Sequence, residues 1–567
     1  MDNIISALYN LNPFQTGENG SKEYGWSNNI RERIVQINFQ LTRSKQKNSH
    51  NASKEFDNDT LLVQIENILS DIQYAHISRE EYVEFMSLCY RMIGFTRDII
   101  DGKGEYALAY KLLDIWAIIN PDLANFALKQ FVLSPTGEHP YGSWKDIKYV
   151  HEYCKSESLH QYSSQLLIEQ LKHDVISDNP SLAAKWVPRE KSKHGYLFTE
   201  LATEYFKEYI LTANNVNSRT RAIIKAKMDF RKIISSLNKK LDTVQIKQCA
   251  NMWSEIDPAK QTSITMHKQK HAFLNVYKNG LQRSVSVDRI TCANNFSEYA
   301  RKAAAGEVEV KGKRIGLNDF VKSALELLSN KDSDEARLLN AQWIDNGKQT
   351  GNLGKMIAMV DVSGSMAGDP MHAAIALGIR VAENSLLGKR VLTFSASPSW
   401  INLETENNFI DMVETISKAN WGMNTNFEAA LNLILDSIIS QKLSPEDVED
   451  MVLVIFSDMQ MDQADGSSSH LMETIEKKYA DAGRRRWKRP FKTPHILFWN
   501  LRSTSGFPTL SSHRNCSMMS GFSPVLLNLF CEEGFDSLQS CTPWSLMVKS
   551  LDNKRYSVLD EFIREIL

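Results

Sequence analysis

The pattern of apolar residues changes at residue 356, and this change most limits how the chain can fold. Before it, apolar residues recur every three to four positions, as in Leu108, Leu112, Ile115 and Ile119, which is the spacing of one helical face. After it, short continuous apolar runs alternate with helical patterns. Such alternation is typical of a parallel sheet covered by helices. The sequence therefore predicts an α + α/β multidomain protein.

Four apolar runs of the second half indicate strands, at residues 356–361, 390–394, 451–456 and 495–499. Helical patterns lie between them at residues 371–387, 409–418, 427–439 and 471–479, and further helix is expected after residue 499. This order predicts a Rossmann-like, doubly wound and mostly parallel sheet over residues 351–567. In such sheets, ligands bind at the carboxyl ends of the strands.

The first 350 residues contain helical patterns and almost no strand signal. The clearest patterns cover residues 61–72, 82–93, 108–119, 121–131, 159–171, 201–211, 223–241 and 317–328. Helices joined by short breaks predict an all-α, HEAT-like helical stack over residues 61–350, although the sequence has no strict period. Residues 1–60 are mostly polar, and we expect a flexible segment with short helices there.

Oxygen-bearing side chains gather in the loops on the predicted ligand side of the sheet. Asp361, Ser363 and Ser365 follow the first strand in a D-x-S-x-S pattern, Thr425 lies in a later loop, and Asp458 follows another strand. A few carboxylates with hydroxyl groups suit Mg²⁺ (or Mn²⁺) and leave room for an acidic group from a partner. For the first three residues alone, the alternative is a turn in which Asp and Ser cap the next helix.

These five residues resemble the metal-ion-dependent adhesion site of von Willebrand factor A domains. The resemblance implies that Ser363 and Ser365 bind the metal directly, and that one or both aspartates hold metal-bound water. Two residues depart from the commonest pattern of that family: Asn424 stands where Gly often precedes the Thr, and Met459 stands where Gly often follows the Asp. These departures bear on metal affinity and choice more than on the existence of the site.

Charge is distributed unevenly along the chain. The whole sequence has 66 Lys and Arg against 68 Asp and Glu, a net charge of −2, whereas residues 185–283 contain 19 basic and 8 acidic residues. Six cations of this stretch are candidates for contacts with RNA phosphates: Arg219, Arg221, Lys225, Lys227, Arg231 and Lys232. The alternative is a solvated helix face, which is the usual origin of a single charged run.

Two further stretches combine aromatic and basic residues. In residues 484–492, Trp487 and Phe491 lie among cations. This pattern suits either a surface on which the aromatic rings stack on unpaired bases or a helix end at which the cations interact with the helix dipole. We favour the helix end. Trp144 and Trp186 each lie next to a basic residue. We expect both to be anchors between helices rather than platforms for bases.

Composition and motifs exclude several classes of protein. Hydrophobic residues make up 42% and charged residues 24% of the chain, as in ordinary globular proteins, and the net charge of −2 excludes a wholly basic nucleic-acid coat. The N-terminus has no secretory pattern, no stretch suits a membrane span, and the seven cysteines form no C-x-x-C pair. We therefore expect an intracellular, cytoplasmic protein that is not secreted and contacts no membrane. Neither a P-loop nor a nucleophile elbow is present, and no enzymatic activity is expected.

Longer motifs extend the comparison with known families over roughly residues 80–465. They are Phe95-Thr-Arg97-Asp98…Gly102-Lys103-Gly104-Glu105, Gly142-Ser-Trp144-Lys145-Asp146, Ala183-Ala-Lys185-Trp186-Val-Pro188, Asp361–Ser365 and Ser457–Ala464. They resemble the Ro autoantigen (TROVE) family and, more closely, a Ro-like family of plants, fungi and giant viruses. The resemblance implies a non-enzymatic RNA-binding scaffold, in which the helical half binds RNA and the A domain binds Mg²⁺ and an acidic partner. The alternative is a protein-interaction adaptor whose A domain binds an acidic partner residue through Mg²⁺ without any RNA.

Overall fold

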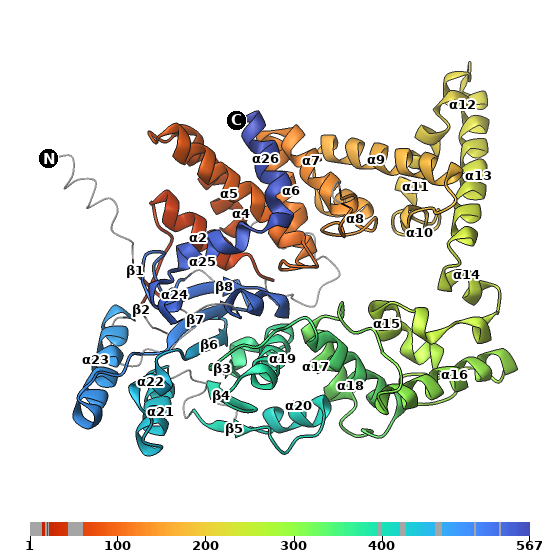
Figure 1. The fold of residues 1–567 in the computed structure, drawn as a ribbon. Coiled ribbons are helices and arrows are strands. Elements are labelled where there is room, and N and C mark those ends of the chain that lie inside the picture. Colours follow the sequence, from red (N-terminus) through yellow and green to blue (C-terminus); the bar gives the residue numbers. More distant parts are fainter. Residues whose placement is uncertain are drawn as a thin grey trace. The chain divides into compact units, whose positions relative to one another are not determined.

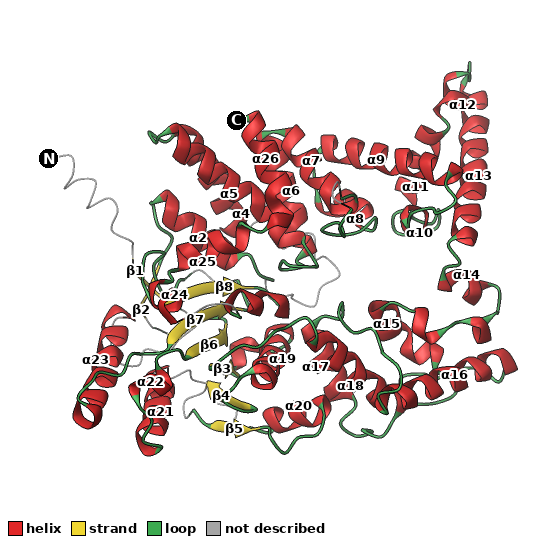
Figure 2. Ribbon diagram, viewed as in Figure 1, coloured by secondary structure: helices red, strands yellow, loops and turns green. Residues whose placement is uncertain are grey.

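The computed structural model describes residues 14–17, 20, 22–43, 60–134, 137–394, 398–419, 427–459, 468–503, 506–531 and 535–567. The chain divides into two compact units, and the first of them is discontinuous in sequence. Unit 1 takes residues 1–96, 101–105 and 300–567, whereas unit 2 takes residues 97–100 and 106–299. The sheets lie in unit 1, and the described part of unit 2 is built from helices (Figures 1 and 2).

A six-stranded sheet forms the centre of unit 1. Its strands, in spatial order, are β5 (Trp400–Asn402), β4 (Arg390–Phe394), β3 (Met356–Asp361), β6 (Val452–Ser457), β7 (His495–Asn500) and β8 (Cys516–Ser520). All neighbouring pairs are parallel except β4 with β5. Every residue of β3, β6, β7 and β8 is buried, because helices and loops cover the sheet. The predicted α + α/β layout with a mostly parallel sheet is confirmed.

The ends of this sheet differ from the prediction. The antiparallel strand β5 was not predicted, and residues 516–520 form strand β8 where helix was expected. The sequence of β8, Cys-Ser-Met-Met-Ser, has no β-branched residue, so its local preference for a strand is weak. Main-chain pairing with β7 and burial of all five side chains determine its conformation.

Helices from distant parts of the sequence pack against the sheet (Figure 1). The helix α19 (Asp369–Asn384) lies against β3 and β6, and α21 (Phe427–Ser440) lies against β4. At the other end, α2 (Ile30–Gln40) and α25 (Pro543–Leu551) both pack on β8. The remaining helices of unit 1 are α4 (Thr60–Tyr74), α5 (Arg79–Arg97, whose last residue falls in unit 2), α17 (Leu317–Glu326), α18 (Asp334–Gly347), α20 (Phe409–Ser417), α22 (Pro445–Val448), α23 (Ser468–Trp487), α24 (Phe535–Ser540) and α26 (Ser557–Ile566).

The close approach of α19 to β3 depends on a glycine. A Cβ atom on Gly378 would lie 2.4 Å from Cγ2 of Val360, far inside van der Waals contact. Both residues belong to the packed interior of unit 1, since Val360 is fully buried. The missing side chain therefore sets the distance between the helix and the strand that carries Asp361 at its end.

Residues 14–43 contribute to unit 1. The strands β1 (Phe14–Thr16) and β2 (Lys22–Tyr24) pair antiparallel, and the main chain of Tyr24 exchanges two hydrogen bonds with Phe507. In α2, every residue from Glu32 to Gln40 is buried. The beginning of the chain therefore packs against elements from its last hundred residues.

Lys103 joins two of these segments. Its ammonium group donates hydrogen bonds to the carbonyl oxygens of Asn38 (2.6 Å) and Leu41 (3.1 Å) at the end of α2. It also donates to the hydroxyl oxygen of Ser520, the last residue of β8, at 2.7 Å. The side chain is buried, and burial lowers the pKa of Lys103 to about 7. One lysine of the Gly102–Glu105 motif thus ties α2 to the sheet.

Unit 2 contains α6 (Tyr106–Ile119), α7 (Pro121–Val132), α8 (Asp146–Tyr153), α9 (Glu157–Ile176), α10 (Ala183–Trp186), α11 (Gly195–Tyr205), α12 (Lys207–Leu211), α13 (Val216–Lys240), α14 (Val244–Cys249), α15 (Ser263–Phe273) and most of α16 (Val287–Ala304). A buried ion pair lies in its interior: the guanidinium of Arg97 donates to both carboxylate oxygens of Asp146 at 2.7 Å each. The hydroxyl group of Tyr110 donates to the same carboxylate. The Arg97 and Asp146 motifs noted in the sequence are therefore structural partners.

Among the residues that the structure describes, no helix combines the length and apolar character needed to cross a bilayer.

Candidate metal site and basic helix

Parallel pairing of β3 with β6 brings Asp361 and Asp458 to the same edge of the sheet. Asp361 ends β3 and Asp458 directly follows β6, with Val360 opposite Phe456 in the register of the two strands. Both aspartates are completely buried. The hydroxyl group of Ser457 donates a hydrogen bond of 2.6 Å to Oδ2 of Asp361, which links the two strand ends directly.

The D-x-S-x-S turn adds two hydroxyl groups beside Asp361. The main-chain N–H of Ser363 donates to Oδ1 of Asp361 at 2.8 Å, and the Oγ atoms of Ser363 and Ser365 lie 3.0 Å apart. The next long helix, α19, is capped by Gly368 without any side-chain hydrogen bond. The side chains of the turn therefore do not cap α19. Four of the five predicted site residues come together at one sheet edge, and Thr425 lies outside the described residues.

Arg502 completes this edge of the sheet and was missed by reasoning from the sequence. It lies two residues beyond the end of β7, and its guanidinium donates a hydrogen bond of 3.0 Å to Oδ2 of Asp458. Only 15% of its side chain is exposed. A signal for it existed, because loops that follow parallel strands share one edge of the sheet.

Electrostatics at the site disfavours two bare carboxylates. Burial, together with the nearby charge of Asp458, raises the pKa of Asp361 to about 6, although hydrogen bonds from Ser457 and Ser363 act in the opposite direction. A divalent cation would stabilise both ionised groups. Among the described residues, no three His, Cys, Asp or Glu side chains gather into a metal-binding group. A metal at this edge would therefore depend on the hydroxyl groups of Ser363 and Ser365 as well, an all-oxygen set that fits Mg²⁺.

Met459 has the backbone conformation that usually requires glycine. Its φ is 62°, in the left-handed region, and its main-chain N–H donates a hydrogen bond of 3.0 Å to Oγ of Ser457. A left-handed conformation is costly for a residue with a side chain. The side chain of Met459 is buried, and its packing offsets part of this cost.

The comparisons with known proteins match both halves of the chain. Residues 147–353 match a family model described as a domain of unknown function (DUF2828), and residues 355–556 match another described as a domain of unknown function (DUF7788). A relative from Acanthamoeba polyphaga mimivirus, Uncharacterized protein L728, is 29% identical over 473 residues, which cover 78% of this chain and 76% of the relative. The chain is thus similar to a protein of a giant virus, as the sequence motifs predict.

All six predicted RNA-contact residues lie on one helix, α13. Three of them are engaged with carboxylates of the chain. Lys227 lies 2.6 Å and Arg231 3.5 Å from the carboxylate of Glu190, and Lys232 lies 3.1 Å from that of Asp229. These pairs neutralise part of the predicted basic surface.

The other three predicted residues, Arg219, Arg221 and Lys225, are exposed. None of them forms an ion pair with a described residue, and the ammonium group of Lys225 lies 4.1 Å from the ring centroid of Tyr209. These three cations remain available to an anionic partner. Lys239, further along α13, is exposed in the same way.

The second basic stretch, residues 484–492, contains the helix end that was favoured from the sequence. α23 ends at Trp487, with Arg484, Arg485 and Arg486 in its last turn, where cations interact favourably with the helix dipole. Arg489 forms an ion pair with Glu446.

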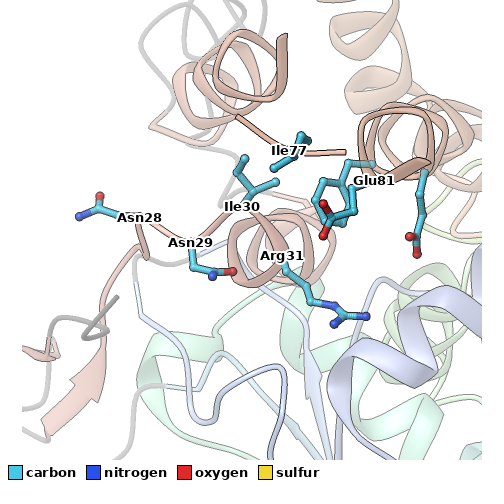
Figure 3. A pocket seen from close by; sticks show the side chains of 8 residues that line it. Asn28, Asn29, Ile30, Arg31, Ile77 and Glu81 are labelled. Carbon is cyan, nitrogen blue, oxygen red and sulfur yellow. The ribbon is translucent and has the colours of Figure 1, made fainter. Parts of the chain in front are cut away.

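Two cavities lie within the units. One, of about 430 Å³ in unit 1, is lined by residues of both charge signs, with Arg31 on α2 and Glu81 on α5 (Figure 3). The guanidinium of Arg31 also lies 4.2 Å from the ring centroid of Trp544. The lining of this cavity has two acids, Glu81 and Glu84, against one cation, Arg31. The other cavity, of about 590 Å³ in unit 2, is strongly basic.

Proposed function

We propose that this chain is a non-enzymatic RNA-binding scaffold. In this proposal, α13, in a HEAT-like helical unit, binds the RNA backbone. The carboxyl edge of the sheet, in a von Willebrand A-like unit, holds Mg²⁺ or Mn²⁺. The observation that carries the proposal is a row of exposed cations along α13.

This row, the α13 stripe, consists of Arg221, Lys225, Lys232 and Lys239. Their spacing of four, seven and seven residues places all four on one side of a helix with 3.6 residues per turn, over a length of about 27 Å. The buried residues of α13, on the opposite side, are Ala226, Phe230 and Leu237. The stripe therefore faces away from the core of unit 2. A long row of exposed cations attracts a phosphate backbone without reading its sequence.

The test compares two double variants that remove equal charge from unit 2. Arg221→Gln with Lys225→Gln takes two cations from the stripe, whereas Lys227→Gln with Lys247→Gln takes two that already pair with Glu190 and Asp242. In filter-binding titrations with single-stranded RNA at several salt concentrations, the stripe variant should lower the log–log salt slope by about 1.4 units. The paired variant should change it by less than half as much. Chelation of divalent metals with EDTA should leave RNA binding intact, because the metal residues belong to unit 1.

The metal part of the proposal rests on the oxygen cluster at the sheet edge. Ser363 and Ser365 would bind the ion through their hydroxyl groups, and Asp361 and Asp458 would balance its charge. An ion held by so few carboxylates keeps coordination positions for water or for a carboxylate of a partner protein, and polarises whatever oxygen it binds. Calorimetric titration of the protein with MgCl₂ tests this part separately from RNA binding.

A protein-interaction adaptor that binds no RNA is the second candidate. The ion pairs of Lys227, Arg231 and Lys232 favour it, since half of the predicted RNA contacts are partly neutralised by the chain itself. Under this alternative, filter binding would detect no RNA even at low salt. Mg²⁺ binding and capture of an acidic peptide by the sheet edge would persist.

A further inference from the structure

The basic cavity of unit 2 lies beside α13. Residues of α8, α10, α13 and α14 line it, and its volume is about 590 Å³, within the range of small-molecule sites. Its walls are partly apolar, through Val187, Phe198, Ile234 and Ile246, and partly basic. One side is formed by the tryptophan of the Ala183–Pro188 motif, and we call the space the Trp186 cavity.

Three ammonium groups surround the indole ring of Trp186. The Nζ atoms of Lys148, Lys185 and Lys145 lie 5.2, 5.7 and 5.8 Å from its ring centroid, close enough for cation–π attraction. Lys145 and Lys148 also lie 4.8 and 5.3 Å from the ring centroid of Tyr149. Aromatic faces therefore hold these lysines together in spite of their mutual repulsion.

The acids near the cavity are already occupied by other cations. Glu190 pairs with Lys227, and Glu152 pairs with Lys193 and lies 3.4 Å from Nε2 of His194.

No described carboxylate lies within ion-pair distance of the three lysines around Trp186. Burial lowers the pKa of each of them. Asp146 and Glu152 act in the opposite direction on the pKa of Lys145 and Lys148, and a bound anion would add to this compensation.

We infer that the Trp186 cavity binds a nucleoside 5′-monophosphate, with the phosphate beside Lys148 and Lys185, which line the cavity, and the base against the apolar wall. A phosphate ion alone would leave most of a 590 Å³ cavity empty.

The nucleotide has two possible sources with the same chemistry: a free monophosphate, or the 5′-phosphorylated end of an RNA. The second source rests on the proposed function, because Arg231 and Asn238 of α13 line the cavity while the stripe lies on the adjoining side of the same helix. An RNA bound along the stripe would then have its first nucleotide within reach of the cavity.

Calorimetric titration of the full chain with AMP, UMP, adenosine and inorganic phosphate tests the site. We expect both monophosphates to bind, and adenosine and phosphate alone to bind at least about tenfold more weakly. Lys148→Gln with Lys185→Gln should weaken monophosphate binding at least about tenfold. The charge-matched control is Lys172→Gln with Lys207→Gln: Lys172 lies over the ring of Tyr205 and Lys207 pairs with Glu204, both outside the cavity. No binding of either monophosphate to the wild type, or equal binding to the two double variants, would overturn the inference.

A second arm distinguishes the sources. Filter binding compares one short RNA with a 5′-phosphate and with a 5′-hydroxyl group. If the phosphorylated RNA binds more tightly, and Lys148→Gln with Lys185→Gln abolishes this preference, the cavity binds RNA ends. Equal binding of the two RNAs, with monophosphate binding intact, assigns it to free nucleotides. Loss of RNA binding in the stripe variant tests the proposed function alone, since it leaves these lysines in place.

Discussion

The guanidinium of Arg502 donates a hydrogen bond of 3.0 Å to Oδ2 of Asp458, a carboxylate with no exposed surface. The chain thus supplies a cation of its own at the edge where the sequence predicts a metal. In the metal-free protein, Arg502 compensates one of two buried acids. A divalent ion bound beside Asp361 would interact with the same carboxylate, Asp458, as this guanidinium. The two cations would then repel each other.

The first prediction concerns Arg502→Gln. Removing the guanidinium leaves Asp458 buried without this partner, which should destabilise the metal-free protein by about 3–5 kcal/mol. Mg²⁺ can replace the lost charge, so millimolar MgCl₂ should raise the Tm of the variant by more than it raises that of the wild type. Thermal unfolding with and without Mg²⁺ measures both effects. Arg489→Gln, which removes an exposed partner of Glu446, is the control and should behave as the wild type. Equal Mg²⁺ shifts in Arg502→Gln and the wild type would contradict the predicted metal site.

The second prediction concerns Asp361→Asn. The amide keeps the size of the side chain and an oxygen that accepts the N–H of Ser363, while the Ser457 hydroxyl can turn to accept a hydrogen bond instead. Because burial and Asp458 already disfavour the charge of Asp361, the variant should fold with nearly unchanged stability. Calorimetry should show no Mg²⁺ binding. Asp361→Ala, by contrast, loses both hydrogen bonds and should lower the free energy of unfolding by about 1–3 kcal/mol. A wild-type Mg²⁺ affinity in Asp361→Asn would count against this site.

Gly378→Ala should destabilise unit 1 through packing. The new Cβ would meet Cγ2 of Val360 at 2.4 Å, and overpacking of this kind costs about 1–3 kcal/mol, more than the gain in helix propensity of up to about 1 kcal/mol. Gly364→Ala is the matched control, because no atom lies within 4 Å of its added Cβ. Urea unfolding should show a lower midpoint for Gly378→Ala and little change for Gly364→Ala. An unchanged midpoint for Gly378→Ala would show that α19 can move away from β3 at little cost.

The fourth prediction concerns Lys103 and pH. Its pKa in the folded state, about 7, lies below the ordinary value of 10.5. Between these two values the unfolded chain binds more protons than the folded one, so the contribution of Lys103 to the free energy of unfolding rises with pH, by up to about 1.4 kcal/mol per unit.

Lys103→Met removes this titration and the hydrogen bonds that the ammonium group donates to the carbonyl oxygens of Asn38 and Leu41, although the Ser520 hydroxyl still lies within hydrogen-bond distance of both oxygens. The variant should be less stable than the wild type by about 1–3 kcal/mol, and the gap should widen from pH 7 to pH 9. Urea unfolding at several pH values measures it. A gap that stays constant over this range would mean that Lys103 stays charged in the fold.

Local patterns in the sequence predict most of the sheet and the position of the site on it. The strands β3 and β7 are continuous apolar runs, and the acid that ends β3 marks its ligand edge, so the apolar pattern alone is enough to place Asp361 there. The edge strand β8 could not be predicted in this way, because its short sequence has no β-branched residue and only a weak strand preference of its own. Its conformation depends on pairing with β7 and on contacts such as that between Ser520 and Lys103, which lie 417 residues apart.

The partners of charged residues were the least predictable feature. Arg502 is a single arginine in a loop, and only the spatial order of the strands brings it to Asp458. Likewise, no spacing in the sequence indicates that Glu190 reaches both Lys227 and Arg231 on α13. Helical periodicity predicts which cations lie on a helix. The three-dimensional fold determines which of them form ion pairs and which stay exposed to solvent.

The discontinuity of unit 1 has a consequence for synthesis of the protein on the ribosome. Unit 2 is complete in the nascent chain once residue 299 has emerged, and it can fold at that point. The helix α2 emerges earlier, yet the strand β8 and helix α25 on which it packs are among the last elements to be made. At roughly 5–20 residues per second, the chain from Thr96 to Leu567 takes on the order of 25 to 95 seconds to synthesise. During that interval, the apolar side of α2 lacks the cover that β8 and α25 give it in the folded protein.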